Sequence, residues 1–205
     1  MEKLVRAALS RMTNIILGLS HHGGVIMGEQ IAVFAGGCFW CTEPVFSQLI
    51  GVQKVVSGYI GGHTANPTYK DICNGDTDHA EGIQITFDPA KISFDELMEI
   101  FFISHDATTR NRQGNDIGTQ YRSAIFCQNE EQRQSAQNMI ARLNAEKMFA
   151  APIVTEINDS AIFYPAEAYH QYYYDKNPGQ PYCMAVAGPK VAKVRAKYAD
   201  RIKPA

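Results

Sequence analysis

The chain has 205 residues, of which 45% are apolar and 20% are charged, and its formal net charge is −2 at pH 7. A chain of this length can bury a substantial core, so we expect one domain of residues 29 to 205 behind an N-terminal extension of residues 1 to 28. The near balance of charge gives no reason to expect nucleic acid or a membrane as a partner. A small neutral substrate or a protein surface fits better.

The extension is basic, but its longest apolar run, residues 15 to 19, is broken by Gly18. This run is too short for a signal-peptide core or a transmembrane helix. We expect the extension to be dispensable, with a targeting segment as the alternative. The five cysteines are an odd and scattered set, which is typical of a reducing compartment with reactive thiols, and we expect a cytoplasmic protein.

The first predicted strand covers residues 30 to 37, an apolar run that ends at two glycines. A helix over residues 38 to 49 follows, and the next strand covers residues 52 to 62. Residues 61 to 81 are polar and rich in glycine, which predicts a long loop of the kind that carries function. This loop leads into a strand over residues 82 to 89, in which apolar residues alternate.

The clearest helix covers residues 93 to 105, where Ser93 and Glu96 form a capping box before an apolar face. A second polar loop follows over residues 106 to 120. The next elements are predicted as a strand over residues 121 to 127, a helix over 129 to 147 and a strand over 152 to 157. A short helix over residues 165 to 177 and an irregular tail over 178 to 190 follow, before a last basic helix. This order predicts an α+β fold, an α/β sandwich on a ferredoxin-like split β-α-β core with long loops and an irregular C-terminal tail.

Cys38 lies where the first strand passes into a helix through Gly36 and Gly37. Free backbone N–H groups and the helix dipole stabilise a thiolate there, so we expect a lowered pKa and a nucleophilic thiol. Cys41 follows one helical turn later, which is also typical of a disulfide oxidoreductase. A zinc-binding interaction module is a third alternative, although no second ligand pair of similar spacing follows and Cys73 with His79 is a loose candidate.

Eight short stretches follow one another along the chain: GCFW, GYIGG, NPTY, HAEGIQITFDP, HDATT, QGNDIGTQYRSAIF, FYPAEAYHQ and a late YC. Together, over about residues 30 to 198, they resemble the A-type peptide methionine sulfoxide reductases, which reverse methionine oxidation. The resemblance implies an oxidoreductase that reduces the S epimer of methionine sulfoxide, free or in proteins, and so repairs oxidised proteins. It implies no bound cofactor and no metal, with electrons supplied by thioredoxin, or by dithiothreitol in vitro.

The resemblance also implies roles for individual residues. Cys38 matches the nucleophile that attacks the sulfoxide sulfur and becomes a sulfenic acid. Glu81 matches the acid, whose pKa burial would raise. Phe39 and Trp40 match the aromatic pair that receives the substrate methyl group.

Three further positions match the substrate pocket of the family. Tyr69 and Tyr121 match tyrosines that hydrogen-bond the sulfoxide oxygen, and Asp116 matches a pocket carboxylate that holds the peptide part or orders a water. His79 and His170 also lie in matching stretches, and for both we expect a structural role.

Cys183 matches the cysteine that resolves the sulfenic acid from a flexible C-terminal segment, and the implied Cys38–Cys183 disulfide would be reduced by thioredoxin. The sequence departs from simpler members at Cys41, where a glycine is frequent, and it lacks the second tail cysteine that some members use as a relay. Cys41 and Cys73 therefore stay open as alternative resolving or relay cysteines. We expect a monomer.

Overall fold

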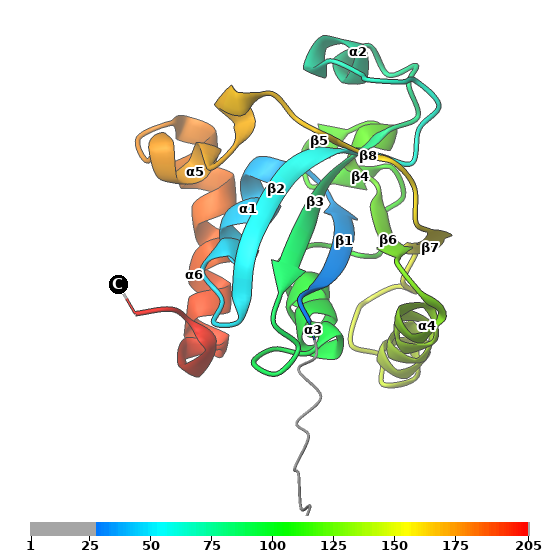
Figure 1. Cartoon of the computed structure of the whole chain (residues 1–205), viewed down its shortest axis with the longest axis vertical. Helices are drawn as coiled ribbons and strands as arrows, with labels where there is room; N and C mark the ends of the chain where they lie inside the picture. The colour runs from blue at the N-terminus through cyan, green and yellow to red at the C-terminus, as the bar shows by residue number, and fades with distance from the viewer. Residues whose placement is uncertain (1–27, 205) are drawn as a thin grey trace, which may run out of the picture.

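Six strands form the main sheet of the computed structural model, which describes residues 28–204, and β4 and β5 form a separate pair (Figure 1). The strands are β1 (Gln30–Gly36), β2 (Val52–Ile60), β3 (Ala80–Phe87), β4 (Arg112–Gln113), β5 (Asp116–Ile117), β6 (Ser123–Cys127), β7 (Glu156–Asp159) and β8 (Phe163–Pro165). The helices are α1 (Phe39–Ser47), α2 (Tyr69–Asn74), α3 (Phe94–Ser104), α4 (Glu130–Ala145), α5 (Tyr173–Lys176) and α6 (Gly188–Lys197).

The main sheet has the strand order β7-β6-β1-β3-β2-β8. Strand β3 lies between β1 and β2 and is antiparallel to both, so β1 and β2 run in the same direction on either side of it and are joined through α1. Strand β6 pairs antiparallel with β1, and β7 runs parallel to β6. The α+β class predicted from the sequence is confirmed, and this order agrees with a split β-α-β core.

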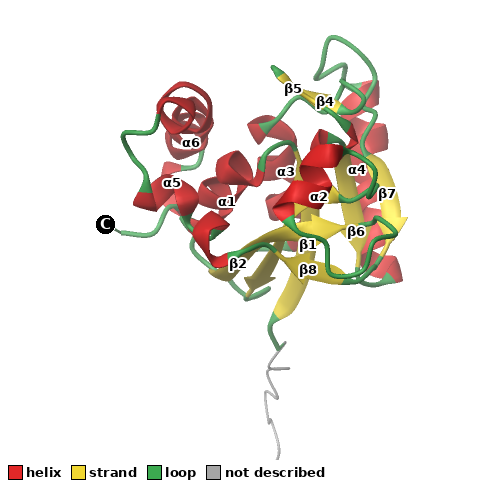
Figure 2. Cartoon of the chain, turned by 90° about the horizontal axis from the view of Figure 1, so that it is seen from above, coloured by secondary structure: helices red, strands yellow, loops and turns green. Residues whose placement is uncertain are grey.

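Both faces of the central strands are buried. Along β1, Ala32 and Phe34 belong to the large core under the helices, whereas Val33 and Ala35 belong to a smaller apolar cluster on the opposite face. This alternation follows from the two-residue repeat of a strand. Helices α1 and α3 lie on one side of the sheet (Figure 2), and α6 packs against both of them.

The candidate functional segments lie at one end of the central strands. The end of β1, the end of β2 and the start of β3 meet there, because Gly36, Ile60 and Ala80 belong to neighbouring ends of paired strands. Helix α2 and the polar loops lie over this end (Figure 1). The loop over residues 61 to 81 was predicted without secondary structure. It contains α2, which begins with a capping box between Thr68 and Asp71.

Two predicted elements are misplaced. The predicted strand over residues 152 to 157 begins too early: Pro152 has no N–H, and Val154 donates its N–H to the Ala107 carbonyl at 2.8 Å, so the ladder starts at Glu156. The predicted helix over residues 165 to 177 is interrupted, because Tyr172 adopts a left-handed conformation with φ 54°. Only a 3-10 turn, Ala168–His170, and the short α5 form there.

The prediction of an irregular C-terminal tail is wrong. Residues 181 to 197 are helical throughout, with a π-helical stretch, Cys183–Ala187, that runs directly into α6. The prolines suggested irregular backbone, but Pro181 stands in the first turn, where its missing N–H costs nothing. Pro189 follows the π-helical stretch, whose wider turn has already shifted the hydrogen-bond pattern.

The predicted extension, apart from Gly28, lies outside the described residues. Within residues 28–204, no helix is long and apolar enough to cross a membrane.

Candidate active site

Cys38 is the N-cap of α1 and is only half-buried, at the end of the central strands described above. The turn before it depends on Gly37, whose φ is +92° and where an added Cβ would lie 2.6 Å from Cγ of Gln113. Glycine alone fits both restrictions without strain. The turn through Gly36 and Gly37 therefore places the Cys38 thiol at the N-terminal end of α1.

Glu81 faces this thiol from the start of β3, opposite Tyr59 of β2. Its side chain is 2% exposed, and Oε2 accepts the N–H of Phe39 at 3.1 Å. Burial raises the pKa of Glu81 to about 8, the nearby Asp116 adds to this, and the hydrogen bonds from Phe39 and Cys38 oppose it. Glu81 therefore keeps a proton at neutral pH next to the candidate nucleophile.

The expected lowering of the Cys38 pKa is not what the structure shows. A hydrogen bond between the Cys38 and Cys41 thiols, burial and the negative charge of Glu81 raise the pKa of Cys38, and only the Trp40 N–H lowers it. The same thiol pair lowers the pKa of Cys41 to about 7. The stabilisation of a thiolate at the helix start is outweighed here by the Cys41 thiol and by burial, and Glu81 takes the Phe39 N–H.

Aromatic rings surround the start of α1. Trp40 is half-buried and stacks on Tyr173 at 3.7 Å between ring centroids, with an interplanar angle of 7°. Its Nε1 donates to Nδ1 of His170 at 3.1 Å. Phe39 is 1% exposed and belongs to the core, with its ring 5.0 Å from that of His170. Of the predicted aromatic pair, Trp40 is therefore partly exposed, and Phe39 is a core residue.

The two predicted tyrosines are both half-buried. Tyr69 is the first residue of α2, and its N–H donates to Oε1 of Glu167 at 2.9 Å. Tyr121 lies in the 3-10 turn before β6. Burial raises the pKa of both phenols, and the charge of Glu81 adds to each shift, so both stay protonated and able to donate a hydrogen bond near Glu81.

Tyr182 is a site residue that the sequence did not single out. Its hydroxyl donates to Oδ2 of Asp116 at 2.6 Å, accepts from Sγ of Cys41 at 3.7 Å, and its ring lies edge-on to Trp40. Its place directly before Cys183 in the late YC stretch was the available signal. Asp116 is thus tied to the thiols through Tyr182.

The other predicted cysteines differ in exposure. Cys183 is 0% exposed within its helix, which contradicts the flexible segment expected from the sequence. Burial raises its pKa, and the charge of Cys41 adds to the shift. The stretch that carries Cys183 packs against α1. Cys73 is exposed on α2 and hydrogen-bonds Tyr69.

The two histidines make fixed hydrogen bonds. His79 accepts the Gly62 N–H at 3.1 Å and its Nε2 lies 2.7 Å from the Thr64 carbonyl, which pins the loop before β3. Burial lowers the pKa of His170, so its ring is neutral and accepts from Trp40. Its buried Nε2 has no hydrogen-bond partner.

Glu43 is a buried carboxylate in α1, one turn after Trp40, and both of its oxygens lack a hydrogen-bond partner. Burial and the charge of Asp175 raise its pKa to about 7, and the N–H groups of Tyr172 and Tyr173 oppose the shift without making hydrogen bonds. No group of three or more His, Cys, Asp or Glu residues in the described part of the chain could hold a metal ion.

Comparisons with known proteins show the family of the chain. The sequence model of the peptide methionine sulfoxide reductase family matches residues 30–202. Peptide methionine sulfoxide reductase MsrA from Deinococcus radiodurans is 56% identical over 175 residues, which is 85% of this chain and 85% of that protein. The MsrA of Chromobacterium violaceum is 53% identical over 172 residues, covering 84% of this chain and 98% of the other.

Solved structures resemble the fold as well. Reduced Mxr1 from Saccharomyces cerevisiae superimposes with a TM-score of 0.68 at 34% identity, over 76% of this chain and 89% of that one. Methionine sulfoxide reductase A of Corynebacterium diphtheriae gives a TM-score of 0.65 at 35% identity, over 74% of this chain and 76% of the other. The chain belongs to the peptide methionine sulfoxide reductase family.

Proposed function

We propose that the protein reduces the S epimer of methionine sulfoxide, free and in proteins, with Cys38 as the nucleophile and Glu81 as the acid. As a member of its family the protein is a methionine sulfoxide reductase, an oxidoreductase. The observation that carries the residue assignment is the protonated Glu81, buried and hydrogen-bonded beside Cys38 at the start of α1.

The first step follows from this geometry. The sulfur of Cys38 attacks the sulfoxide sulfur, and its proton leaves along the hydrogen bond to Cys41. Glu81 gives its proton to the sulfoxide oxygen, which ends on Cys38 as a sulfenic acid while methionine is released. The substrate is reduced by two electrons, and the sulfur of Cys38 is oxidised by two.

The pocket residues would hold the substrate during this step. The methyl group packs against Trp40, with Phe39 behind it, and the phenols of Tyr69 and Tyr121 donate to the oxygen. Asp116, fixed by Tyr182, would contact the peptide part of the substrate or order a water.

Racemic methionine sulfoxide with dithiothreitol tests the epimer. About half of the substrate should be consumed, because the two faces of the sulfur cannot present the methyl group to Trp40 and the oxygen to both phenols equally well. Consumption of both epimers, or of neither, contradicts the proposal. Cys38→Ser should abolish turnover, and retained activity would move the nucleophile elsewhere.

A disulfide oxidoreductase is the second candidate, favoured by the contact between the Cys38 and Cys41 thiols. Reduction of insulin disulfides separates the two functions, since a sulfoxide reductase should catalyse it poorly. Rapid insulin reduction without sulfoxide turnover would select this candidate.

We also propose thioredoxin as the reductant, in a monomeric cytoplasmic enzyme with no bound cofactor. Clearing a sulfenic acid with a second thiol leaves a disulfide, and returning the enzyme to its dithiol form needs electrons from an external reductant such as thioredoxin. All five cysteines are free in this structure, as a reducing compartment requires. NADPH consumption coupled through thioredoxin reductase and thioredoxin should depend on methionine sulfoxide.

A further inference from the structure

We propose that Cys41, and not Cys183 or Cys73, is the residue that resolves the sulfenic acid on Cys38. This inference rests on the proposed function, in which Cys38 receives the oxygen. It changes the order expected from the family resemblance, in which the cysteine near the C-terminus acts first.

The first turn of α1 brings the two thiols together. Cys38 is the N-cap and Cys41 the third residue of the helix, and the Cys41 N–H donates to the Cys38 carbonyl at 3.0 Å. Residues three apart lie on one face of a helix, and the two thiols are close enough for each to shift the pKa of the other. Cys41 can therefore reach the sulfur of Cys38 with a side-chain rotation and no movement of the backbone.

The surroundings of Cys41 favour its thiolate, which is the form that attacks. The neighbouring Cys38 thiol and the positive charge of Lys190 lower the pKa of Cys41 to about 7, whereas burial and the charge of Asp116 oppose this shift. Cys41 is 0% exposed, so this thiolate is kept from bulk solvent and faces Cys38.

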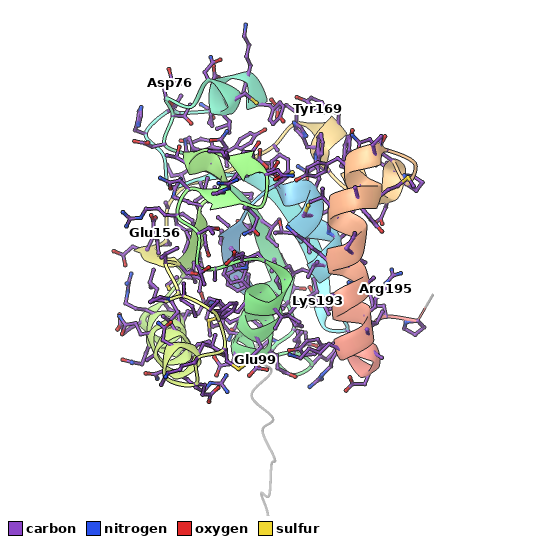
Figure 3. The ribbon with its side chains drawn as sticks, turned by 180° about the vertical axis from the view of Figure 1, so that it is seen from behind. Asp76, Glu99, Glu156, Tyr169, Lys193 and Arg195 are labelled. Atoms are coloured by element: carbon purple, nitrogen blue, oxygen red, sulfur yellow. The ribbon has the colours of Figure 1, made fainter. Side chains whose placement is uncertain are left out.

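Cys183 is 0% exposed on a helix that is anchored to the rest of the domain. Lys193 lies on the side of α6 toward α3 (Figure 3) and donates to the Ile103 carbonyl at 2.9 Å, and Arg195 donates to Oε1 of Gln48 at 2.7 Å. Beyond α6, the Ile50 N–H donates to the Arg201 carbonyl at 2.8 Å. Cys183 therefore has less freedom to approach Cys38 than the flexible segment expected from the sequence would give it.

Cys183 is better placed to act after Cys41. The π-helical stretch that carries Cys183 packs against α1, the helix that carries Cys41. A disulfide between Cys38 and Cys41 could therefore pass to Cys183 by exchange. Cys73 is exposed on α2, where its thiol hydrogen-bonds Tyr69.

The resolving step balances without a further reactant. The sulfur of Cys41 attacks the sulfur of Cys38, the S–S bond forms and the S–O bond breaks. The hydroxide leaves as water with the proton that Cys41 had taken from Cys38, so the oxygen carries away one proton from Cys38 and one from Glu81. Cys41 is oxidised, the sulfenic acid is reduced to the disulfide, and Glu81 regains its proton from solvent. An external dithiol then reduces the disulfide and is itself oxidised.

Single turnover of the full chain tests the order. Reduced protein, freed of reductant, is mixed with one equivalent of methionine S-sulfoxide, quenched at increasing times by alkylation in acid, and mapped by peptide mass spectrometry. The first disulfide should join Cys38 to Cys41 in the wild type and in Cys183→Ser, with one equivalent of methionine formed. A first disulfide from Cys38 to Cys183 or to Cys73 overturns the proposal.

Two variants sharpen the result. Cys41→Ser should still release up to one equivalent of methionine but should accumulate a sulfenic acid on Cys38, which a dimedone probe traps. Cys73→Ser is the matched control and should map as the wild type does. A Cys41→Ser variant that loses its sulfenic acid as fast as the wild type contradicts the proposal. Absence of methionine from every variant and the wild type would instead reject the proposed function itself.

Discussion

Glu81 serves two purposes with one carboxyl group: it caps α1 by accepting the Phe39 N–H, and it holds a proton with a pKa of about 8. Both depend on its position at the inner face of β3. The capping contact can be kept while the proton is removed, because a glutamine at this position still offers a carbonyl oxygen to Phe39.

Glu81→Gln should slow methionine release in a single turnover by about 10²- to 10⁴-fold, the usual contribution of a general acid. In the wild type this rate should fall as the pH rises through about 8, since the acid form of Glu81 is lost there. The alkaline fall should vanish in the variant. An unchanged rate would remove Glu81 from the acid role.

Glu43 should make stability depend on pH. Its pKa is raised from 4.5 to about 7, so the folded protein holds a proton that the unfolded chain releases within this window. The free energy of unfolding therefore falls as the pH rises from about 4.5 to 7, by up to about 3 kcal/mol.

Glu43→Gln should remove this part of the fall, measured by urea unfolding at pH 5 and pH 8. Glu131→Gln, at an exposed carboxylate in the first turn of α4, is the matched control and should keep the wild-type slope. The raised pKa of Glu81 also makes the free energy of unfolding fall as the pH rises, but it does so equally in both variants. Equal slopes for the two variants would contradict the role of Glu43.

At the residue scale, the sequence predicted the chemistry of residues that lie in a recognisable motif. It did not predict properties that depend on tertiary contacts. The burial of Glu81 agrees with the raised pKa that the resemblance implied. The pKa of Cys38 is shifted in the direction opposite to that expected from its helix position, because the Cys41 thiol, burial and Glu81 outweigh the free N–H groups. The sequence does not show that Tyr182 lies beside Trp40 and Cys41, because that contact joins residues more than 140 positions apart.

At the scale of elements, the accuracy of prediction followed the strength of the local pattern. Strands β1 and β3 and helix α3 were predicted correctly, since alternation and a capping box are local features. Helix α2 was missed because its capping box uses Asp71 and its six residues have one buried side chain, so no apolar period marks it. The helix through Cys183 was missed because packing on α1 and α3 outweighs its glycines and prolines.

The N-cap of α2, Thr68, can be changed without changing Tyr69, the residue of this helix proposed to contact the substrate. Thr68 accepts the Asp71 N–H through Oγ1 at 3.3 Å, and Tyr69 follows directly. Thr68→Ala should cost about 1 kcal/mol of helix stability. If Tyr69 binds substrate, KM for methionine sulfoxide should rise by up to about fivefold.

Ser93→Ala supplies the matched control for this change. Ser93 caps α3 through the same contact, with its Oγ 3.1 Å from the Glu96 N–H, but α3 carries none of the proposed site residues. This variant should lower the melting temperature and leave KM unchanged. A KM that responds equally to both variants would show that α2 has no special part in binding.

At the scale of the whole molecule, the identity of the disulfide should be visible in stability. A disulfide stabilises a protein mainly by closing a loop in the unfolded chain, by about 2 kcal/mol for a loop as short as Cys38 to Cys41 and about 5 kcal/mol for the long loop from Cys38 to Cys183. Protein trapped by alkylation at its first disulfide should therefore be about 2 kcal/mol more stable than reduced, alkylated protein in urea unfolding. A gain near the larger figure at this stage would indicate the long loop.

The extension should be dispensable for catalysis. All proposed site residues lie between Cys38 and Cys183, the family match begins at residue 30, and β1 begins at Gln30. A chain that starts at Met27 should keep the free energy of unfolding and the kcat of the full chain, measured by urea unfolding and dithiothreitol-dependent turnover. A loss of either would give the extension a role in the folded enzyme.

The stack of Trp40 on Tyr173 has one more consequence, because Trp40 is the only tryptophan in the chain. Its indole emission is therefore a single-site optical signal from beside Cys38, with no background from other indoles. Quenching or a wavelength shift on mixing would give dissociation constants and rates for sulfoxide and product without a label. Any change of the neighbouring thiols would be recorded by the same ring, so binding and redox chemistry could be timed in one trace.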